Sequence, residues 1–190
     1  MDMTTDTQAL KKQEILDRAE RLFYCGGFHA TGVDAVLADS GISKRTLYKY
    51  FASKEDLIEA VLDRYAGNVE AMIFDPALAR TGDPRGRILA VFDVRRDLMD
   101  ATAFAGCLAM KAAEEYKDRH PGIEAAGRRS VDYVKARFVD LCREAGYADP
   151  DGLGAMVALL LQGAVLTSQL RRDTTAFAPA KAAVERLLAA

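Results

Sequence analysis

The stretch that decides the fold is GISKRTLYKYFASK, residues 41–54. It holds four cations, Lys44, Arg45, Lys49 and Lys54, and no acidic residue. Duplex DNA carries one negative charge per about 1.7 Å of its axis, and a local cluster of cations provides the contacts that its phosphates require. The segment therefore predicts a surface that contacts nucleic acid, although the net charge of the whole chain is -2.

Hydroxyl-bearing side chains are interleaved with these cations. Thr46, Tyr48 and Tyr50 can donate to phosphate oxygens, while Lys44 and Arg45 stand at the start of a helix, where base edges are reached. The alternative is a charged helix face that is merely solvated, as most runs of charge are. A solvated face does not account for two tyrosines and a threonine among the cations, so we favour DNA contact.

The other side of the segment predicts a buried helix face and a tight turn. Leu47 and Phe51 lie four residues apart and so share one face. Ser43 can cap a helix that runs through Tyr50, and Gly41 suits a turn position with positive φ. The short helix before Gly41, the turn and the helix after it have the proportions of a helix-turn-helix.

Capping patterns predict two further helix starts nearby. Thr31 followed by Asp34 predicts the start of the preceding helix, which ends at Ser40, because the hydroxyl can cap free backbone amides and the acid favours the positive helix end. Ser53 with Asp56 repeats this pattern for the helix that follows. Four helices are thus expected in about the first seventy residues.

The rest of the chain keeps the helical period, without the alternation that is typical of strands. The stretch DPALARTGDPRG, residues 75–86, combines two prolines with two glycines, and we expect a loop at a domain junction there. We therefore predict an all-α fold of about nine helices, with a three-helix head that contains the helix-turn-helix and a C-terminal helical bundle.

The segment RLFYCGGFHATGVDAVLADSGISKRTLYKYFASKEDLIEAVL resembles the N-terminal domain of the tetracycline-repressor (TetR) family of regulators, and the similarity extends across residues 8–68. This resemblance implies an all-helical homodimer with a DNA-binding domain over residues 8–68. It also implies a ligand-binding and dimerisation domain over residues 69–190. The C-terminal part resembles the family only in outline.

The resemblance assigns roles within the head by position. Lys44 and Arg45 match positions that reach base edges, and Tyr48 matches one that touches bases or backbone. Gly32 stands where the family often has a second threonine, which removes one phosphate donor. The residues expected at the DNA are Thr31, Lys44, Arg45, Thr46, Tyr48, Lys49, Tyr50 and Lys54.

The helix expected from Asp151 to about Arg172 is apolar around its whole circumference, so it is expected to be covered on both sides. One cover is its own domain. The other is either a second copy of the chain, which we favour, or the remainder of a monomeric bundle. The residues expected at a dimer interface are Leu160, Leu161, Val165, Val184 and Leu188.

Bulky side chains of the C-terminal part can line a cavity for an apolar or aromatic small molecule, although each can equally belong to an ordinary core. No motif names the ligand. The residues expected at such a pocket are Phe92, Phe104, Cys107, Met110, Tyr133, Met156 and Gln162.

The sequence contains no set of residues typical of catalysis. His29 and His120 are the only histidines, and HExxH, GxSxG and the P-loop pattern are absent, so we expect no enzymatic activity, no metal and no cofactor. Cys107 can be a redox sensor or, as we favour, an inert buried thiol. The rival interpretations are a helical-bundle enzyme or carrier with a vestigial head, and a DNA-binding regulator without a ligand.

The composition predicts a cytoplasmic protein without a membrane segment. Three scattered cysteines form no CxxC spacing, and the longest apolar run, Leu153 to Leu166, is broken by Gln162 and falls short of the ~18 residues that span a bilayer. We expect a sequence-specific transcriptional regulator, most simply a repressor that binds a near-palindromic operator as a homodimer and is released by a small-molecule effector.

Overall fold

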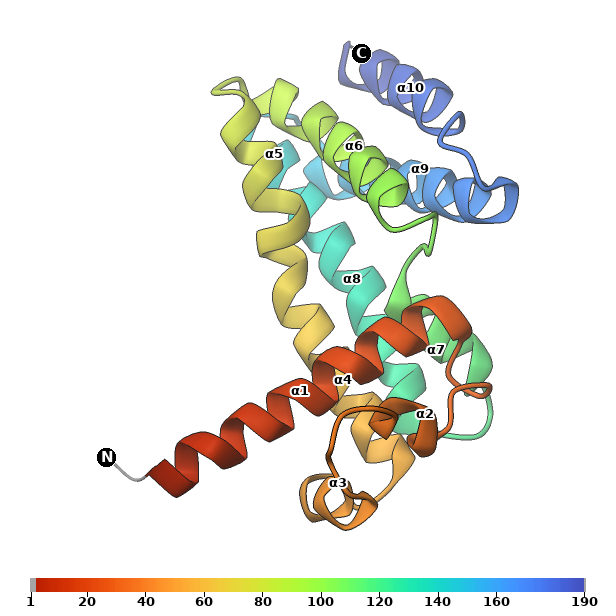
Figure 1. Ribbon diagram of the computed structural model, residues 1–190. Helices are drawn as coiled ribbons and strands as arrows, with labels where there is room; N and C mark the ends of the chain where they lie inside the picture. The colour runs from red at the N-terminus through yellow and green to blue at the C-terminus, as the bar shows by residue number, and fades with distance from the viewer. Residues whose placement is uncertain (1–2, 190) are drawn as a thin grey trace. The chain divides into compact units, whose positions relative to one another are not determined.

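The computed structural model describes the backbone of residues 3–189 and the side chains of residues 8–189 (Figure 1). These residues form ten α-helices and one π-helix, and no strand occurs among them. Helix α4 (Lys54–Val69), the π-helix η1 (Glu70–Phe74) and α5 (Asp75–Arg80) follow one another without a break. Counting these three as one leaves nine helical rods, so the predicted all-α class and helix number are confirmed.

The chain forms two compact units. The first unit contains the residues up to Ala66 together with Leu108–Arg128, and the second contains Gly67–Cys107 together with the chain from Arg129 onward. The sequence predicted a single boundary, after residue 68. In the structure the first unit also takes in helix α7 (Leu108–Glu115) and the start of α8 (Pro121–Glu144).

The first unit is built on α1 (Met3–Gly26), α2 (Val33–Leu37), α3 (Lys44–Tyr50) and the first part of α4. Its core joins these elements through aromatic and branched side chains. Phe28, just after α1, returns to this core and stacks on Phe23 at a ring-centroid distance of 4.9 Å. The fully buried core residues of this unit include Ile15, Phe23, Phe28, Leu47, Leu57 and Ile58.

Two of the three predicted helix caps are present. The Oγ atoms of Ser43 and Ser53 accept the backbone N–H groups of Thr46 (3.1 Å) and Asp56 (3.0 Å), at the starts of α3 and α4. The third prediction was wrong, because Gly32 precedes α2 and provides no side-chain cap. Helix α2 therefore begins without the hydroxyl that the sequence pattern indicated.

The second unit contains η1, α5, α6 (Pro84–Ala101), the later part of α8, α9 (Pro150–Arg171) and α10 (Phe177–Ala189). The loop predicted over residues 75–86 is mostly helical. Pro76 lies in the first turn of α5, and the helical rod that comes from η1 continues through it to Arg80. Only residues 81–83 separate α5 from α6, and the Asp83 carboxylate caps α6 by accepting the N–H of Gly86 at 2.8 Å.

Helix α9 is surrounded on several sides by its own unit. It packs on α6 and α10, and at Gly154 it approaches α8 so closely that a Cβ would lie 2.6 Å from the Val139 backbone nitrogen. Helix α9 is the one described helix that is long and apolar enough to cross a membrane by length and composition, although the sequence argument judged its apolar run to be broken by Gln162 and too short. Since 44% of its most apolar window is buried, packing within the unit accounts for much of that apolar character.

Candidate DNA-binding face

A rigid turn mounts α3 on α2. The Ser40 hydroxyl donates to the Leu37 carbonyl oxygen (2.7 Å) and accepts the N–H of Ile42 (3.0 Å). Gly41 has φ of 68°, as predicted, and Asp39 also lies in the left-handed region with φ of 56°. The turn is held by side-chain bonds as well as by backbone conformation, which fixes the direction in which α3 leaves it.

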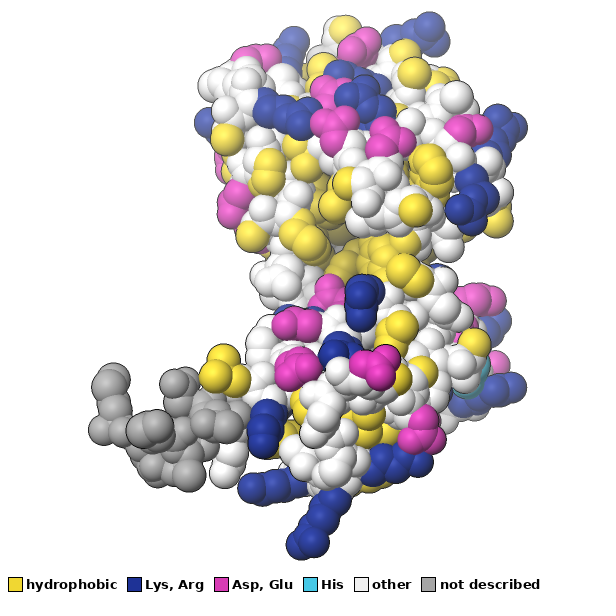
Figure 2. Space-filling model, viewed as in Figure 1, with side chains coloured by type: hydrophobic (Ala, Val, Ile, Leu, Met, Phe, Trp, Pro, Cys, Tyr) yellow, Lys and Arg dark blue, Asp and Glu magenta, His cyan; other side chains and the backbone are white. Residues whose placement is uncertain are grey.

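Helix α3 has the predicted buried side and an exposed side. Leu47 is fully buried and Phe51 is 4% exposed, so both anchor the helix in the first unit. Arg45 and Lys49 are exposed on the outer side, and Tyr48 is 47% exposed. Dark-blue cationic side chains project at the lower end of the view in Figure 2, where Figure 1 places α3.

Lys44 is paired with an acid that the sequence placed at a helix start. Its Nζ lies 2.7 Å from Oδ1 of Asp34 in α2, and this hydrogen bond raises the pKa of Lys44. Both side chains are well exposed, so the pair is weak and a phosphate or a base edge can compete for the ammonium. The pairing crosses the turn between two helices, and no local sequence pattern predicted it.

Three other expected DNA residues are partly engaged within the head. Thr46 lies beside the Ser43 cap, with its Oγ1 2.9 Å from the Ser43 Oγ. Tyr50 is half-buried and edge-on to Phe51, and the Lys54 ammonium donates to the His29 carbonyl oxygen at 3.5 Å. These contacts hold the side chains near the face that Arg45, Tyr48 and Lys49 present.

Thr31 is not part of this face. Its side chain is 6% exposed, and its hydroxyl donates to the Gly27 carbonyl oxygen at 2.7 Å. The hydroxyl closes the loop between α1 and α2, so its proton is not available to a phosphate. The expectation that Thr31 contacts DNA is therefore corrected, for a steric and a hydrogen-bonding reason.

The same loop is fastened by α7, a contact that the sequence did not reveal. The Glu115 carboxylate accepts the backbone N–H groups of Phe28 (3.1 Å) and His29 (2.7 Å). The His29 ring stacks on Tyr116 at a centroid distance of 4.6 Å. His29 itself is exposed, and its partners in α7 lie more than eighty residues away along the chain, so no local sequence pattern predicted these contacts.

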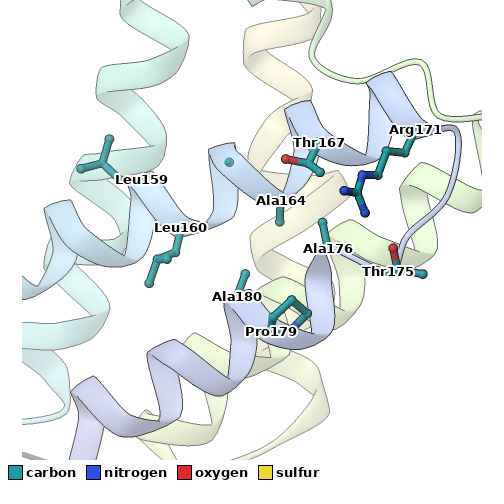
Figure 3. A pocket seen from close by; sticks show the side chains of 10 residues that line it. Leu159, Leu160, Ala164, Thr167, Arg171, Thr175, Ala176, Pro179 and Ala180 are labelled. Atoms are coloured by element: carbon teal, nitrogen blue, oxygen red, sulfur yellow. The ribbon is translucent and has the colours of Figure 1, made fainter.

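The second unit has an open groove of about 480 Å³ between α9 and α10 (Figure 3). Figure 3 shows Leu159, Leu160 and Ala164 along one side and Pro179 and Ala180 along the other. Thr167, Arg171 and Thr175 bring polar groups to one end of this groove. None of the residues predicted for a ligand pocket lines it, whereas the predicted interface residue Leu160 does.

Most of the predicted interface residues are buried in their own protomer. Leu161, Val165, Val184 and Leu188 are each at most 6% exposed, so they form the core of the second unit and are corrected as interface residues. The outer side of α9 carries a different set at helical spacing. This α9 stripe consists of Met156, Leu159, Gly163, Leu166 and Leu170, all of them exposed.

The predicted pocket residues lie in different surroundings. Phe92 is fully buried against Phe138. The Tyr133 hydroxyl donates to Glu70, and burial with this bond raises the pKa of Tyr133 to about 12. Met156 is exposed in the α9 stripe. Phe104, Cys107 and Gln162 are half-buried in the second unit, and Met110 is half-buried in the first.

The described residues include no group of three His, Cys, Asp or Glu side chains that could hold a metal ion. The α3 face presents hydrogen-bond donors and cations on a short helix that buried Leu47 and Phe51 anchor. Such a face can donate to phosphate oxygens and to the acceptor atoms of bases in a major groove.

Comparisons with known proteins agree with this geometry. Residues 15–61 match the family described as bacterial regulatory proteins, tetR family. The chain is 27% identical to the uncharacterized helix-turn-helix transcriptional regulator YxaF of Bacillus subtilis (strain 168), over 86% of this chain and 87% of that protein. It is 25% identical to the transcriptional repressor NemR of Escherichia coli (strain K12), over 75% of this chain and 73% of that protein.

A solved structure of a TetR-family transcriptional regulator from Streptomyces coelicolor superposes with a TM-score of 0.83 at 26% identity, covering 96% of this chain and 95% of that one. The match to the family thus includes the helix-turn-helix itself, and the similarity in fold extends over both units. Residues 15–61 of this chain therefore carry a helix-turn-helix domain of the TetR family, and the chain as a whole is similar in sequence and fold to TetR-family transcriptional regulators.

Proposed function

We propose that the chain is a repressor that binds a near-palindromic operator as a homodimer and leaves it when a small molecule binds to the second unit. The outer face of α3 carries this proposal, because Arg45, Tyr48 and Lys49 are exposed together on a helix that Leu47 and Phe51 anchor. Because the operator is part of the DNA in the cytoplasm, we also propose a cytoplasmic location for the protein.

The proposed DNA-contacting residues of α3 and of the start of α4 divide into two roles. Arg45 and Lys44, in the first turn of α3, reach base edges, and Lys44 exchanges Asp34 for DNA as it does so. Tyr48, Lys49, Tyr50, Thr46 and Lys54 hold phosphates and set the position of the helix in the groove.

Dimerisation supplies the second recognition helix. The α9 stripe exposes Leu159 and Leu170 by 68% and 77%, and burying such side chains against a second copy removes apolar surface from water. Gly163 lies in the middle of the stripe, and nothing apart from the adjoining backbone of α9 lies within 4 Å of an ideal Cβ there, which leaves room for close approach of a partner helix. A homodimer of this kind places two α3 helices in successive major grooves, about 34 to 36 Å apart.

Release by an effector follows from a shift between two states. One state has the α3 spacing that fits the operator, and the other does not. A ligand that binds the second state more tightly lowers the operator affinity, by a factor no larger than the ratio of its affinities for the two states. The relative NemR, which is similar over 75% of this chain, is named a repressor, whereas the relative FasR of Mycolicibacterium smegmatis, which is named an activator, matches 47% of it; the longer match supports repression.

The test is a selection of bound duplexes from random DNA, followed by titration of the selected operator at several salt concentrations. We expect a near-palindromic site and a steep fall of affinity with salt, because each phosphate contact releases a counterion. Recovery of no preferred sequence would contradict sequence-specific binding. If no tested compound changes the operator affinity, the alternative of a DNA-binding regulator without a ligand is favoured.

A further inference from the structure

Arg95 is a cation buried in the apolar face of α6. Its side chain is 4% exposed and lies one turn from Val91 and one turn from Met99, both of which are fully buried. Residues four apart on a helix share a face, so the guanidinium occupies a position that otherwise belongs to the core. Among the residues that the structure describes, no Asp or Glu forms an ion pair with it.

The hydrogen bonds of Arg95 are incomplete. One terminal nitrogen, Nη2, donates to the Gly106 carbonyl oxygen at 2.7 Å, whereas the other, Nη1, is buried without any partner. A guanidinium has five N–H donors and keeps its charge at every physiological pH. Burial of a charge is strongly disfavoured unless an opposite charge and hydrogen bonds compensate for it, and one neutral carbonyl does neither fully.

The carbonyl that Arg95 holds belongs to a strained loop. Ala103, Phe104 and Gly106 all have positive φ, of 49°, 63° and 82°. Left-handed conformations at non-glycine residues cost energy and are found where the surroundings enforce them, often at ligand clamps. The Arg95 to Gly106 bond thus fixes an unusual backbone directly after α6.

The end of α9 completes the surroundings of this loop. A Cβ on Gly106 would lie 2.2 Å from the Oε1 atom of Gln169, so the loop contacts α9 closely. Ser168, the neighbour of Gln169, is fully buried and its Oγ has no partner. Nη1 of Arg95 and Oγ of Ser168 are the two buried side-chain polar atoms without a partner among the described residues, and their helices pack together.

We propose that Arg95 is the anchor for an organic acid in the second unit. A carboxylate accepts a hydrogen bond from Nη1 and neutralises the buried guanidinium, and the unpartnered Ser168 hydroxyl on the adjoining helix α9 is a further donor in this unit. This inference rests on the proposed function, since the acid is the effector that we assign to this unit. The sequence led us to expect an apolar or aromatic small molecule, whereas this inference predicts a ligand that carries a negative charge.

The test compares acids with their own amides in thermal unfolding of the full chain. Acetate, benzoate and octanoate are measured against acetamide, benzamide and octanamide, with ionic strength matched by sodium chloride. We expect at least one acid to raise the Tm by about 5 °C at a concentration 100-fold above its Kd, and its amide to have no such effect. If no acid exceeds its amide, the proposal is overturned.

Variants separate an anion anchor from a residue that only holds the loop. Arg95→Met keeps much of the volume without the charge, and the acid-specific shift should disappear. Arg95→Lys keeps the charge without the planar fork and should retain the preference for the acid at an affinity reduced by about tenfold, which gives a result even if Arg95→Met does not fold. An acid-specific shift that persists in folded Arg95→Met, or one that is lost in folded Arg95→Lys, contradicts the assignment.

Operator binding distinguishes this inference from the proposed function. An acid that stabilises the wild-type chain through Arg95 but leaves operator affinity unchanged would overturn release and leave the anion site standing. A neutral compound that releases the operator, in a chain that binds none of the three acids, would do the reverse.

Discussion

Glu115 and His29 are joined twice: the Glu115 carboxylate accepts the His29 backbone N–H at 2.7 Å, and the His29 Nε2 lies 2.7 Å from the Glu115 backbone oxygen. Residues in α7 thus hold the loop between α1 and α2, and the carbonyl oxygen of His29 accepts a hydrogen bond from the Lys54 ammonium. Helix α7 is therefore part of the same unit as α3, although α7 comes much later in the sequence.

Replacing Glu115 should destabilise the first unit. Glu115→Ala removes the acceptor for two backbone N–H groups, and we expect a loss of about 1 to 3 kcal/mol in the free energy of unfolding. Denaturation in urea measures the loss. Glu114→Ala, at the exposed neighbouring position, is the control and should change stability by less than about 0.5 kcal/mol. Equal effects of the two variants would show that the bonds to the loop contribute nothing.

The Lys44 to Asp34 pair should restrain non-specific DNA binding. Asp34→Asn removes the acid that lies 2.7 Å from the Lys44 ammonium, so we expect about two- to fivefold tighter binding to a non-operator duplex at low salt. Asp39→Asn removes one negative charge from the turn and keeps a side chain that tolerates positive φ, which makes it the matched control. Fluorescence anisotropy reports the affinities, and identical changes would mean that net charge alone matters.

Reactivity should separate the cysteines. Burial raises the pKa of Cys142 from 9.0 to about 11, whereas Cys25 is exposed. At pH 8 a disulfide reagent should modify Cys25 rapidly and Cys142 only after unfolding, because the thiolate is the nucleophile. Modification of Cys142 at the rate seen in denaturant would contradict the burial.

The raised pKa of Cys142 also sets the sign of a pH effect. Its contribution to stability is complete below pH 9 and is lost as the pH rises toward 11, because the unfolded thiol ionises first. Comparing Cys142→Ala with the wild type across this window isolates the contribution of this thiol.

The α9 stripe should mediate the dimer. Gly163→Arg places a long cation in the middle of the stripe, where nothing apart from the adjoining backbone of α9 lies within 4 Å of a Cβ, so we expect a folded monomer by light scattering. Gly67→Arg in α4 is the control, since its Cβ position is equally open. A Gly163→Arg protein that remains dimeric would place the interface elsewhere. A charge at Leu161 is unsuitable for this purpose, because that side chain is in the core.

The sequence predicted what depends on neighbours along the chain. The caps at Ser43 and Ser53, the buried pair Leu47 and Phe51, and the positive φ of Gly41 all follow from residues within a few positions. These features are sufficient to define α3 and the turn before it, which is why the helix-turn-helix could be recognised.

Features that depend on distant partners were missed. The side of α9 that faces inward could not be chosen, because the helix is apolar all round, and so Leu161 and Val165 were expected at an interface. The role of Glu115 depends on a loop more than eighty residues away. Thr31 was misjudged for a different reason, because its hydroxyl donates to the nearby Gly27 carbonyl oxygen instead of capping α2. The burial of Arg95 could not be predicted either, because its position in the sequence does not distinguish it from the exposed arginines of the same helix.

Recognition of DNA by α3 is the central claim, and paired variants test it most directly. Arg45→Ala, Lys54→Ala and the distant exposed control Arg186→Ala are titrated with the selected operator and a scrambled duplex across a range of salt. Arg45→Ala should relax discrimination at one base step by about 1 to 3 kcal/mol. Lys54→Ala should weaken both duplexes alike and reduce the salt slope by about 1. If both variants bind as Arg186→Ala and the wild type do, α3 is not the recognition helix.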